Sequence, residues 1–225
     1  AANKLIEEFM LLANKKVAKL FIKHKNGLFR VHDYPDDKKI ITLERIIKKL
    51  GYKQNLRNTK NINNQLNLLL KQTEDSPEKN LIDTLVIRSM SKAKYSTKNI
   101  GHFGLSFEKY THFTSPIRRY PDVLVHRELE RILLNNKSNQ NLEKLCLHCS
   151  NREETATKAE RASIKFMQVK YMSKNINKTY EGVISGITER GIFVEAVENK
   201  CEGFIRIKDI PGDYFNFLEN EMLLL

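Results

Sequence analysis

The chain has 225 residues, 40 % of them hydrophobic, which is enough for one or two domains with an ordinary core. Its 39 Lys and Arg residues outnumber its 27 Asp and Glu residues, so the net charge is +12. No stretch approaches the ~20 apolar residues of a membrane-spanning helix, and Glu7 and Glu8 break the first apolar run, so we expect neither a membrane span nor a signal peptide. Three cysteines cannot all pair with one another, so a reducing, cytoplasmic location is expected.

The positive charge lies almost entirely before residue 174. Residues 174–225 carry 6 basic and 9 acidic side chains, a net of −3, which leaves +15 for residues 1–173. A surplus of this size favours a phosphate-rich partner such as a nucleic acid. The alternative is that many of the lysines only solvate the outer faces of helices.

Most of the elements predicted before residue 174 are helices. In the first helix, apolar residues recur at three- and four-residue steps from Leu5 to Phe21, and Gly27 follows as a terminator. Loops are predicted around Pro35 and in the Asn-rich segment 53–63. The apolar spacing predicts helices over residues 3–24, 37–50, 62–70, 77–91, 121–134 and 141–174.

Two prolines predict where helices begin. Ser76 followed by Pro77 offers a capping hydroxyl and then a proline at the first helical position. Pro121 opens a later helix in the same way. Between them, residues 92–117 mix aromatic, Gly, Ser and Thr residues without a helical period, so we expect loops and short strands there.

The long helix predicted over residues 141–174 carries two patterns of its own. Phe166, Val169 and Met172 form an apolar stripe that we expect to lie in a core. Cys146 and Cys149 have the spacing of half a zinc site, but no second pair follows, and one nearby histidine does not complete four ligands. We therefore expect buried thiols.

After residue 178 the apolar residues change from a helical to an alternating period. Residues 191–195 and 203–207 are typical of strands that begin at glycine. We therefore expect one domain over residues 1–173 and a second over residues 178–225. Residues 221–225 are an apolar run without a cap, so we expect the chain to end within this second domain.

Residues 101–129 are the most informative segment. They mix basic side chains with aromatic rings, which suits single-stranded nucleic acid because bases stack on rings and arginines bind phosphates. Arg118 and Arg119 follow the break at Pro116 and precede a helix start, where free backbone donors favour a phosphate. The alternative is that this pair is a surface charge capped by Asp122. The basic residues are His102, His112, Arg118, Arg119, His126 and Arg127, and the rings belong to Phe103, Phe107, Tyr110, Phe113 and Tyr120.

The string Tyr-x-His-Phe-Thr-Ser-Pro-Ile-Arg-Arg-Tyr-Pro-Asp over residues 110–122 resembles the signature of the RNB family of 3′→5′ exoribonucleases (the RNase R / RNase II family). Residues 102–105 stand at the matching distance, residues 7–14 resemble the family's EE-x-M-x-x-AN helix, and residues 30–35 resemble its R-x-H-x-x-P loop. Residues 182–194 resemble an S1-motif OB barrel. The order and spacing are most similar to the RNase R pattern, over essentially the whole chain.

This resemblance implies a fold and an activity. The fold is α+β: a mostly helical C-terminal part of an RNB catalytic domain, followed by a partial β-barrel of the OB/S1 type. The activity is processive hydrolysis of single-stranded RNA from the 3′ end to nucleoside 5′-monophosphates, with Mg²⁺ ions bound by an aspartate cluster. The intact enzyme is expected to be a monomer, with RNA and not a membrane as its partner.

The resemblance also implies roles for single residues. Arg118 would meet the charge that develops on the scissile phosphate, and Arg119 would bind a neighbouring phosphate. One of the pair Glu7 and Glu8, with Glu8 favoured, would lie near the 2′-OH of the 3′-terminal ribose, and Glu160 would border the RNA channel.

Four further residues are predicted to contact RNA. Tyr110 and His112 belong to the aromatic segment, where the alternative for His112 is general-base catalysis. In the barrel, Phe193 matches a position that stacks a base. Arg206 stands where histidine is frequent, and arginine can both stack and pair with phosphate.

The aspartates depart from the family pattern, because none forms the D-x-D-D-type cluster that the family carries upstream. Asp33, Asp36 and Asp37 come nearest, but Pro35 predicts a turn, and Asp36 and Asp37 are favoured at a helix start. We therefore expect no metal ligand in this chain and no activity from the chain alone. Two alternatives stay open, a non-catalytic single-stranded RNA-binding module and one half of a split enzyme.

Overall fold

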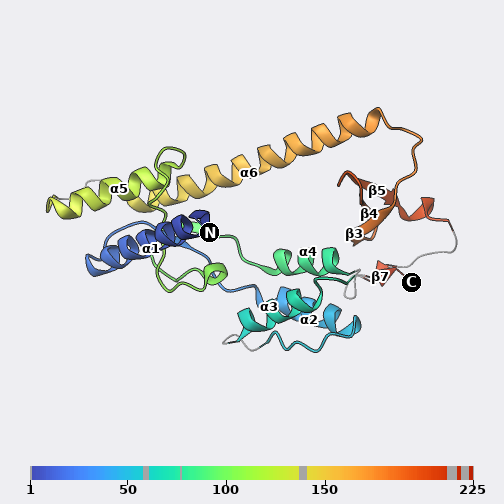
Figure 1. Ribbon diagram of the computed structural model, residues 1–225, viewed down its shortest axis with the longest axis horizontal. Helices are drawn as coiled ribbons and strands as arrows, with labels where there is room; N and C mark the ends of the chain where they lie inside the picture. Colours follow the sequence, from blue (N-terminus) through green and yellow to red (C-terminus); the bar gives the residue numbers. More distant parts are fainter. Residues whose placement is uncertain are drawn as a thin grey trace. The chain divides into compact units, whose positions relative to one another are not determined.

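The computed structural model describes residues 2–57, 61–76, 78–136, 141–211, 217–218 and 223–224 (Figure 1). The chain divides into two compact units. Unit 1 contains residues 1–34 and 91–160, and unit 2 contains residues 35–90 and 161–225. Within the described part of the chain, no helix combines the length and the apolar character that crossing a membrane requires.

In the described residues, unit 1 contains three α-helices and a short two-stranded sheet. The helices are α1 (Ala2–Lys23), α5 (Tyr120–Leu133) and the first part of α6 (Leu142–Ser173). The strands β1 (Phe29–Val31) and β2 (Lys94–Ser96) pair antiparallel, and η1 (Phe103–Leu105) is a single 3-10 turn. The helices predicted from residue 3, from Pro121 and from residue 141 are confirmed.

The core of unit 1 joins all of these helices to the sheet. Phe21 of α1, Val31 of β1 and Val125 of α5 are fully or almost fully buried in one cluster. Cys146 and Cys149 of α6 lie in the same cluster as free thiols, which confirms the prediction of buried cysteines. Burial raises the pKa of the Cys146 thiol to about 12.

Gly27 is required by a close approach of the backbone to a ring. Helix α1 ends at Lys23, and Gly27 follows with a φ of 157°. A Cβ atom at this position would overlap the ring of Phe21. The chain can therefore turn from α1 into β1 over the buried Phe21 only because residue 27 has no side chain.

The two residues that flank segment 35–90, Tyr34 and Ser91, lie side by side in unit 1. The chain leaves unit 1 after Tyr34 and returns at Ser91. The hydroxyl of Ser91 donates a hydrogen bond to the carbonyl oxygen of Tyr34 at 2.6 Å. His32 Nε2 lies 2.8 Å from the carbonyl oxygen of Ser91. These hydrogen bonds thus join the residues before segment 35–90 to the residue after it.

In unit 2, residues 35–90 form a three-helix segment. It contains α2 (Asp37–Lys49), α3 (Ile62–Gln72) and α4 (Lys79–Ser89), as the apolar spacing predicted. Asp36 caps α2, because its Oδ1 accepts a hydrogen bond from the backbone N–H of Lys39 at 3.1 Å. The prediction that Asp36 stands at the start of the next helix is therefore confirmed.

The prediction that Ser76 caps the helix after it is wrong. The Ser76 hydroxyl donates to the carbonyl oxygen of Thr73 at 3.1 Å, at the end of α3. Helix α4 begins at Lys79, and Glu78 precedes it without a side-chain cap. A hydroxyl can bond to a carbonyl of a preceding turn as readily as to a following N–H, and here it bonds to the preceding turn. Pro77 lies outside the described residues.

The second part of unit 2 is an antiparallel meander of β3 (Gly182–Thr188), β4 (Gly191–Ala196) and β5 (Glu202–Arg206). A bulge interrupts the pairing of β3 with β4 between Ile184 and Gly186. The 3-10 turn η2 (Ile207–Asp209) follows, and the short strands β6 (Phe217–Leu218) and β7 (Leu223–Leu224) pair with each other. The predicted strands of residues 191–195 and 203–207 are confirmed. Of the predicted apolar run, residues 221, 222 and 225 lie outside the described residues.

The prediction of a buried stripe on α6 is wrong. Phe166 is 66 % exposed and Val169 is 59 % exposed, whereas Met172 is half-buried. The hydrogen bonds between this part of α6 and the meander are made by polar side chains instead. Lys165 donates to the carbonyl oxygen of Glu202 at 2.9 Å, and Gln168 donates to that of Lys200 at 3.0 Å.

Candidate nucleic-acid interface

The motif arginines lie on a hydrogen-bonded turn directly before α5. The backbone N–H groups of Arg118 and Arg119 both donate to the carbonyl oxygen of Ser115, at 3.3 and 3.1 Å. Tyr120 is the first helical residue and Pro121 the second, where its missing N–H costs no helical hydrogen bond. The turn therefore places two guanidinium groups beside the start of a helix, as the sequence predicted.

Arg118 presents its side chain to solvent. The residue is exposed, and within the described part of the chain it makes no side-chain hydrogen bond or ion pair. An unpaired guanidinium keeps all five of its donors available for a phosphate. Its guanidinium is therefore accessible to an anion from solution.

Arg119 is held by the protein. Its Nη2 donates to Oδ1 of Asp122 at 2.8 Å, and only 23 % of its side chain is exposed. Asp122 is fully buried, and the same oxygen accepts a hydrogen bond from the backbone N–H of Ser115 at 2.8 Å. The alternative that Asp122 pairs with the arginines applies to Arg119 and not to Arg118. The sequence indicates Asp122 only as that surface counter-charge and does not predict its burial.

His112 is half-buried. Its Nδ1 is 3.0 Å from the hydroxyl oxygen of Tyr95. Burial lowers the pKa of His112 to about 3, and the positive charges of Arg119 and Arg30 add to the effect. His112 is therefore neutral at physiological pH and can donate or accept one hydrogen bond without adding charge to the site.

Arg30 is the arginine of the R-x-H-x-x-P loop, and it links β1 to α6. It forms a two-bond ion pair with Glu153, at 2.5 and 2.9 Å. Its guanidinium lies 4.7 Å from the centre of the Tyr95 ring. Because Tyr95 in turn contacts His112, the contacts from Glu153 through Arg30 to Tyr95 hold the partner of the His112 ring in place.

Tyr110 is buried rather than open to a stacking base. It is 5 % exposed, and its ring makes edge contacts with His102 and His112. The Asn14 side chain of α1 donates to the Tyr110 hydroxyl at 3.1 Å and accepts from the backbone N–H of Phe113 at 3.0 Å. Asn14 is a buried amide on an otherwise apolar helix face, and this pattern is the signal that could have identified it as a structural link.

His32 and His102 form a second aromatic contact within unit 1. His32 Nδ1 accepts a hydrogen bond from the backbone N–H of Gly104 at 3.1 Å, so Nε2 carries the proton and donates to the carbonyl oxygen of Ser91. A Cβ on Gly104 would lie only 2.9 Å from this Nδ1. Burial lowers the pKa of His102 to about 4, with neighbouring His32 adding to the effect. Both rings hold the loop of residues 101–107 in place.

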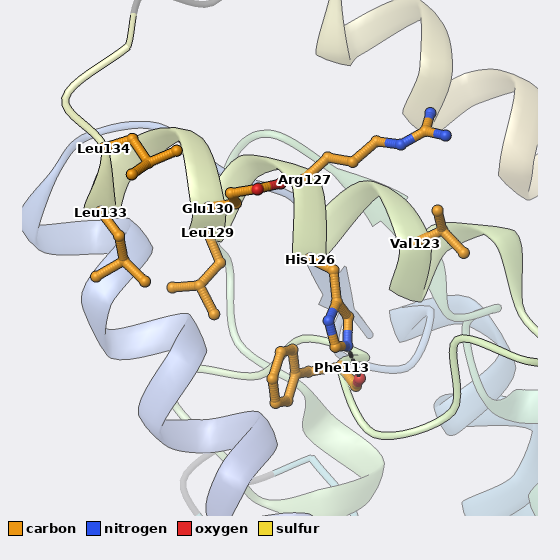
Figure 2. Close-up of a pocket in the computed structure, with 8 residues that line it drawn as sticks. All are labelled: Phe113, Val123, His126, Arg127, Leu129, Glu130, Leu133 and Leu134. Carbon is orange, nitrogen blue, oxygen red and sulfur yellow. Dashed lines mark hydrogen bonds between the residues drawn. The ribbon is translucent and has the colours of Figure 1, made fainter.

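A groove of about 460 Å³ lies along one side of α5 (Figure 2). The His126 ring stacks on Phe113 with centres 4.2 Å apart, and its Nε2 lies 2.8 Å from the Phe113 carbonyl oxygen. Figure 2 shows the Arg127 side chain extending away from this stacked pair. The contact through Nε2 ties His126 to the backbone of the motif segment. The groove is lined by Phe113, Val123, His126, Arg127, Leu129, Glu130, Leu133 and Leu134.

The two predicted carboxylates both reach solvent. Glu8 lies on the exposed first half of α1, where Phe9 beside it is 61 % exposed. Glu160 is the last residue of unit 1 and is exposed on α6. Within the described residues neither carboxylate makes a hydrogen bond or an ion pair, so both are available to a ligand.

The two predicted residues of the meander lie in unit 2. Phe193 on β4 is half-buried, and its ring centre lies 4.9 Å from that of Phe204 on β5. Arg206, at the end of β5, is exposed and pairs through Nε with Asp209 at 2.6 Å. An aromatic pair beside an arginine is an arrangement on which a nucleotide can stack.

The described residues offer no metal site. Over these residues no group of three or more His, Cys, Asp or Glu side chains is close enough to hold an ion. The nearest candidates from the sequence are used locally, since Asp33 accepts from the N–H of Tyr34 and Asp36 caps α2. The described residues therefore do not fit the Mg²⁺ that the resemblance implies.

Two family models match the chain. The model described as "RNB domain" matches residues 1–135. The model described as "S1 RNA binding domain" matches residues 173–221. The first match contains the arginine turn, and the second contains the whole β3–β4–β5 meander.

Curated and solved relatives agree with these matches. The chain is 40 % identical to Ribonuclease R of Aquifex aeolicus (strain VF5), over 97 % of this chain and 32 % of that protein. It superposes on the apo form of Mycoplasma genitalium RNase R with a TM-score of 0.90 and 33 % identity, over 99 % of this chain and 36 % of that one. The same enzyme in complex with ribose methylated single-stranded RNA gives a TM-score of 0.88 and 34 % identity, with the same coverage. The chain thus spans about a third of these relatives, and it belongs to the RNB family.

Proposed function

We propose that this chain is part of a processive 3′→5′ exoribonuclease that hydrolyses single-stranded RNA to nucleoside 5′-monophosphates. Relatives named Ribonuclease R align over nearly the whole chain, and one has been solved with single-stranded RNA. The net charge of +12 suits such a polyanionic substrate. Because the chain spans about a third of these relatives, the proposal concerns the intact protein.

The exposed and unpaired Arg118 is the observation that carries this proposal. Phosphodiester hydrolysis builds negative charge on the phosphate oxygens, and a pre-positioned guanidinium lowers the energy of that state. Arg119 and Arg30 are already engaged with carboxylates of the protein. Arg118, in contrast, has no such partner within the described residues. This difference, together with the place of Arg118 in the motif, supports the catalytic role that we propose for it.

The other predicted residues are assigned to RNA binding around Arg118. Arg119 uses Nη2 for Asp122, and we assign the remainder of its guanidinium to a neighbouring phosphate. Neutral His112 contributes a hydrogen bond, and Tyr110 supports His112 from the interior. We assign the exposed Glu8 to the terminal ribose and Glu160 to the channel.

In unit 2, the meander supplies a second region of RNA contact. We assign base stacking to Phe193, whose ring lies beside that of Phe204. We assign Arg206 to a phosphate or a base, because its exposed guanidinium can serve either. An RNA-binding role for this region agrees with the family model that matches it.

The metal that such hydrolysis uses would be bound elsewhere in the intact enzyme. We propose that its carboxylate ligands, in a Mg²⁺ enzyme, lie outside the 225 residues of this chain, and that the chain alone does not hydrolyse RNA. A monomeric enzyme of the cytoplasm is the setting that the sequence favours. Release of mononucleotides by the purified chain with Mg²⁺ would contradict the inactivity of the chain alone.

The test is substitution of Arg118 in the intact enzyme. We expect Arg118→Ala to lower kcat on single-stranded RNA by about 10³-fold, by analogy with arginines in phosphoryl transfer, while Kd for the same RNA changes far less. Arg152→Ala is the matched control, because Arg152 is an exposed arginine of unit 1 outside the motif. Equal losses in kcat and affinity would reassign Arg118 to binding. Binding without any turnover by the unmodified intact protein would favour the non-catalytic alternative.

A further inference from the structure

The turn that carries Arg118 is built around one buried carboxylate. Asp122 is fully buried, although it belongs to the first turn of α5. One of its oxygens, Oδ1, accepts two hydrogen bonds of 2.8 Å, from the Ser115 backbone N–H and from Nη2 of Arg119. These donors stand at the first and last residues of the five-residue turn 115–119. Asp122 therefore ties both ends of the turn to the helix.

The backbone closes the same turn from the inside. The N–H groups of Arg118 and Arg119 donate to the Ser115 carbonyl oxygen, and the N–H of Asp122 donates to the Arg119 carbonyl oxygen at 3.2 Å. Ser115 is thus bonded through both its N–H and its carbonyl. The backbone of Arg118 is fixed between these bonds, whereas its side chain is exposed.

The buried pair is not arranged to maximise stability. Burying a carboxylate is costly unless every polar atom is compensated. Within the described residues, Oδ2 of Asp122 and Nε of Arg119 are buried without a hydrogen-bond partner, so the pair is not bidentate. An ion pair that is kept at such a cost, directly beside an exposed functional group, points to a geometric rather than a stabilising role.

We propose that Asp122, with Arg119 as its counter-ion, is a positioning residue that holds the turn of residues 115–119 so that Arg118 points at the scissile phosphate. This inference rests on the catalytic role proposed for Arg118. Asp122 is buried and does not touch RNA. It acts through the backbone bond to Ser115 and the side-chain bond to Arg119.

The same helix provides a matched control pair. Glu128 and Arg131 are also three residues apart on α5, and their Oε2 and Nε atoms lie 2.8 Å apart. Glu128 is 3 % exposed, so this carboxylate is buried almost as deeply as that of Asp122. The pair lies beyond the arginine turn. Glu128→Gln therefore disturbs a comparable buried ion pair without touching residues 115–119.

The test is a double-mutant cycle in the intact enzyme. We expect Asp122→Asn to lower kcat by about 10- to 100-fold, the scale of a displaced catalytic group, with a much smaller change in KM. In an Arg118→Ala background the same substitution should change kcat by less than about twofold, because no positioned group is left to lose. Glu128→Gln should lower Tm and leave kcat within about twofold of the unmodified enzyme.

Equal kcat losses from Asp122→Asn in both backgrounds would overturn the proposal, because they would show a general effect on the fold. If Asp122→Asn does not fold, the neutral pair Asp122→Asn with Arg119→Gln replaces it under the same criteria. Should Arg118→Ala alone leave kcat unchanged, the proposed function fails, and amide hydrogen exchange decides the geometry. Faster exchange at Ser115 and Arg118 in Asp122→Asn, but not in Glu128→Gln, supports the positioning role, and unchanged exchange overturns it.

Discussion

Neutral His112 makes the folded chain sensitive to acid. Its ring is half-buried beside the Tyr95 hydroxyl and faces the positive charges of Arg119 and Arg30. Its pKa falls from 6.5 to about 3, mainly through burial. We therefore predict that acid destabilises the fold well before the carboxylates titrate, and that replacing this one ring removes part of the effect.

The magnitude follows from the difference between the two pKa values. Between pH 6.5 and about pH 3 the unfolded chain binds a proton at His112 that the folded chain does not, so stability falls as the pH falls through this window. The slope is about 1.4 kcal/mol per pH unit, which amounts to about 3 kcal/mol of lost stability between neutral pH and about pH 4. Above pH 6.5 His112 is neutral in both the folded and the unfolded chain, so no stability is lost through this group.

The assay is urea denaturation of the chain from pH 7 down to pH 4, for the unmodified protein and for His112→Asn. Asparagine keeps a polar atom near the Nδ1 position that contacts Tyr95, but it does not titrate. The pH slope should be shallower by about 1.4 kcal/mol per unit in the variant. An NMR titration that gives His112 a pKa of 6 or above, or identical slopes for both proteins, would refute the reasoning.

Two further predictions concern the helix start at Asp36 and the thiols of α6. Asp36→Ala should lower the free energy of unfolding by about 1 kcal/mol, because the backbone N–H of Lys39 loses its cap. Asp37→Ala is the control, because it removes no such bond and should lower the free energy of unfolding by less. Equal effects of the two variants in urea denaturation would contradict the cap. Because burial raises the pKa of both Cys146 and Cys149, native protein at pH 8 should react with iodoacetamide far more slowly than unfolded protein, and rapid native labelling would show these thiols to be accessible.

Local sequence signals predicted the helices and strands well, because each was strong over many residues. The three- and four-residue spacing from Leu5 to Phe21 gave α1, and Pro121 marked the start of α5 to within one residue. The glycines at 191 and 203 marked the strands of the meander. The motif at residues 110–122 indicated the site because its residue order is specific, and the family match includes it.

The errors arose where a residue's role depends on which neighbour it meets. Ser76 can bond forward or backward along the chain, and only the structure shows that it bonds to Thr73. Phe166 has the spacing of a core residue, but within unit 2 this part of α6 makes hydrogen bonds through Lys165 and Gln168 and leaves the ring exposed. Asp122 looked like a surface counter-charge, and its burial depends on the fold of the turn around Ser115. The periodicity of apolar residues does not show which of several nearby partners a polar side chain binds.

The hydrogen bond between Ser91 and Tyr34 has a consequence for how this protein can vary. The residues that flank the three-helix segment 35–90 lie next to each other, so the segment is attached to unit 1 like an insertion with adjacent ends. The entropy cost of closing an inserted segment changes only slowly with the length of the segment. Changes in the length of this segment are therefore compatible with an unchanged pairing of β1 with β2 and an unchanged arginine turn.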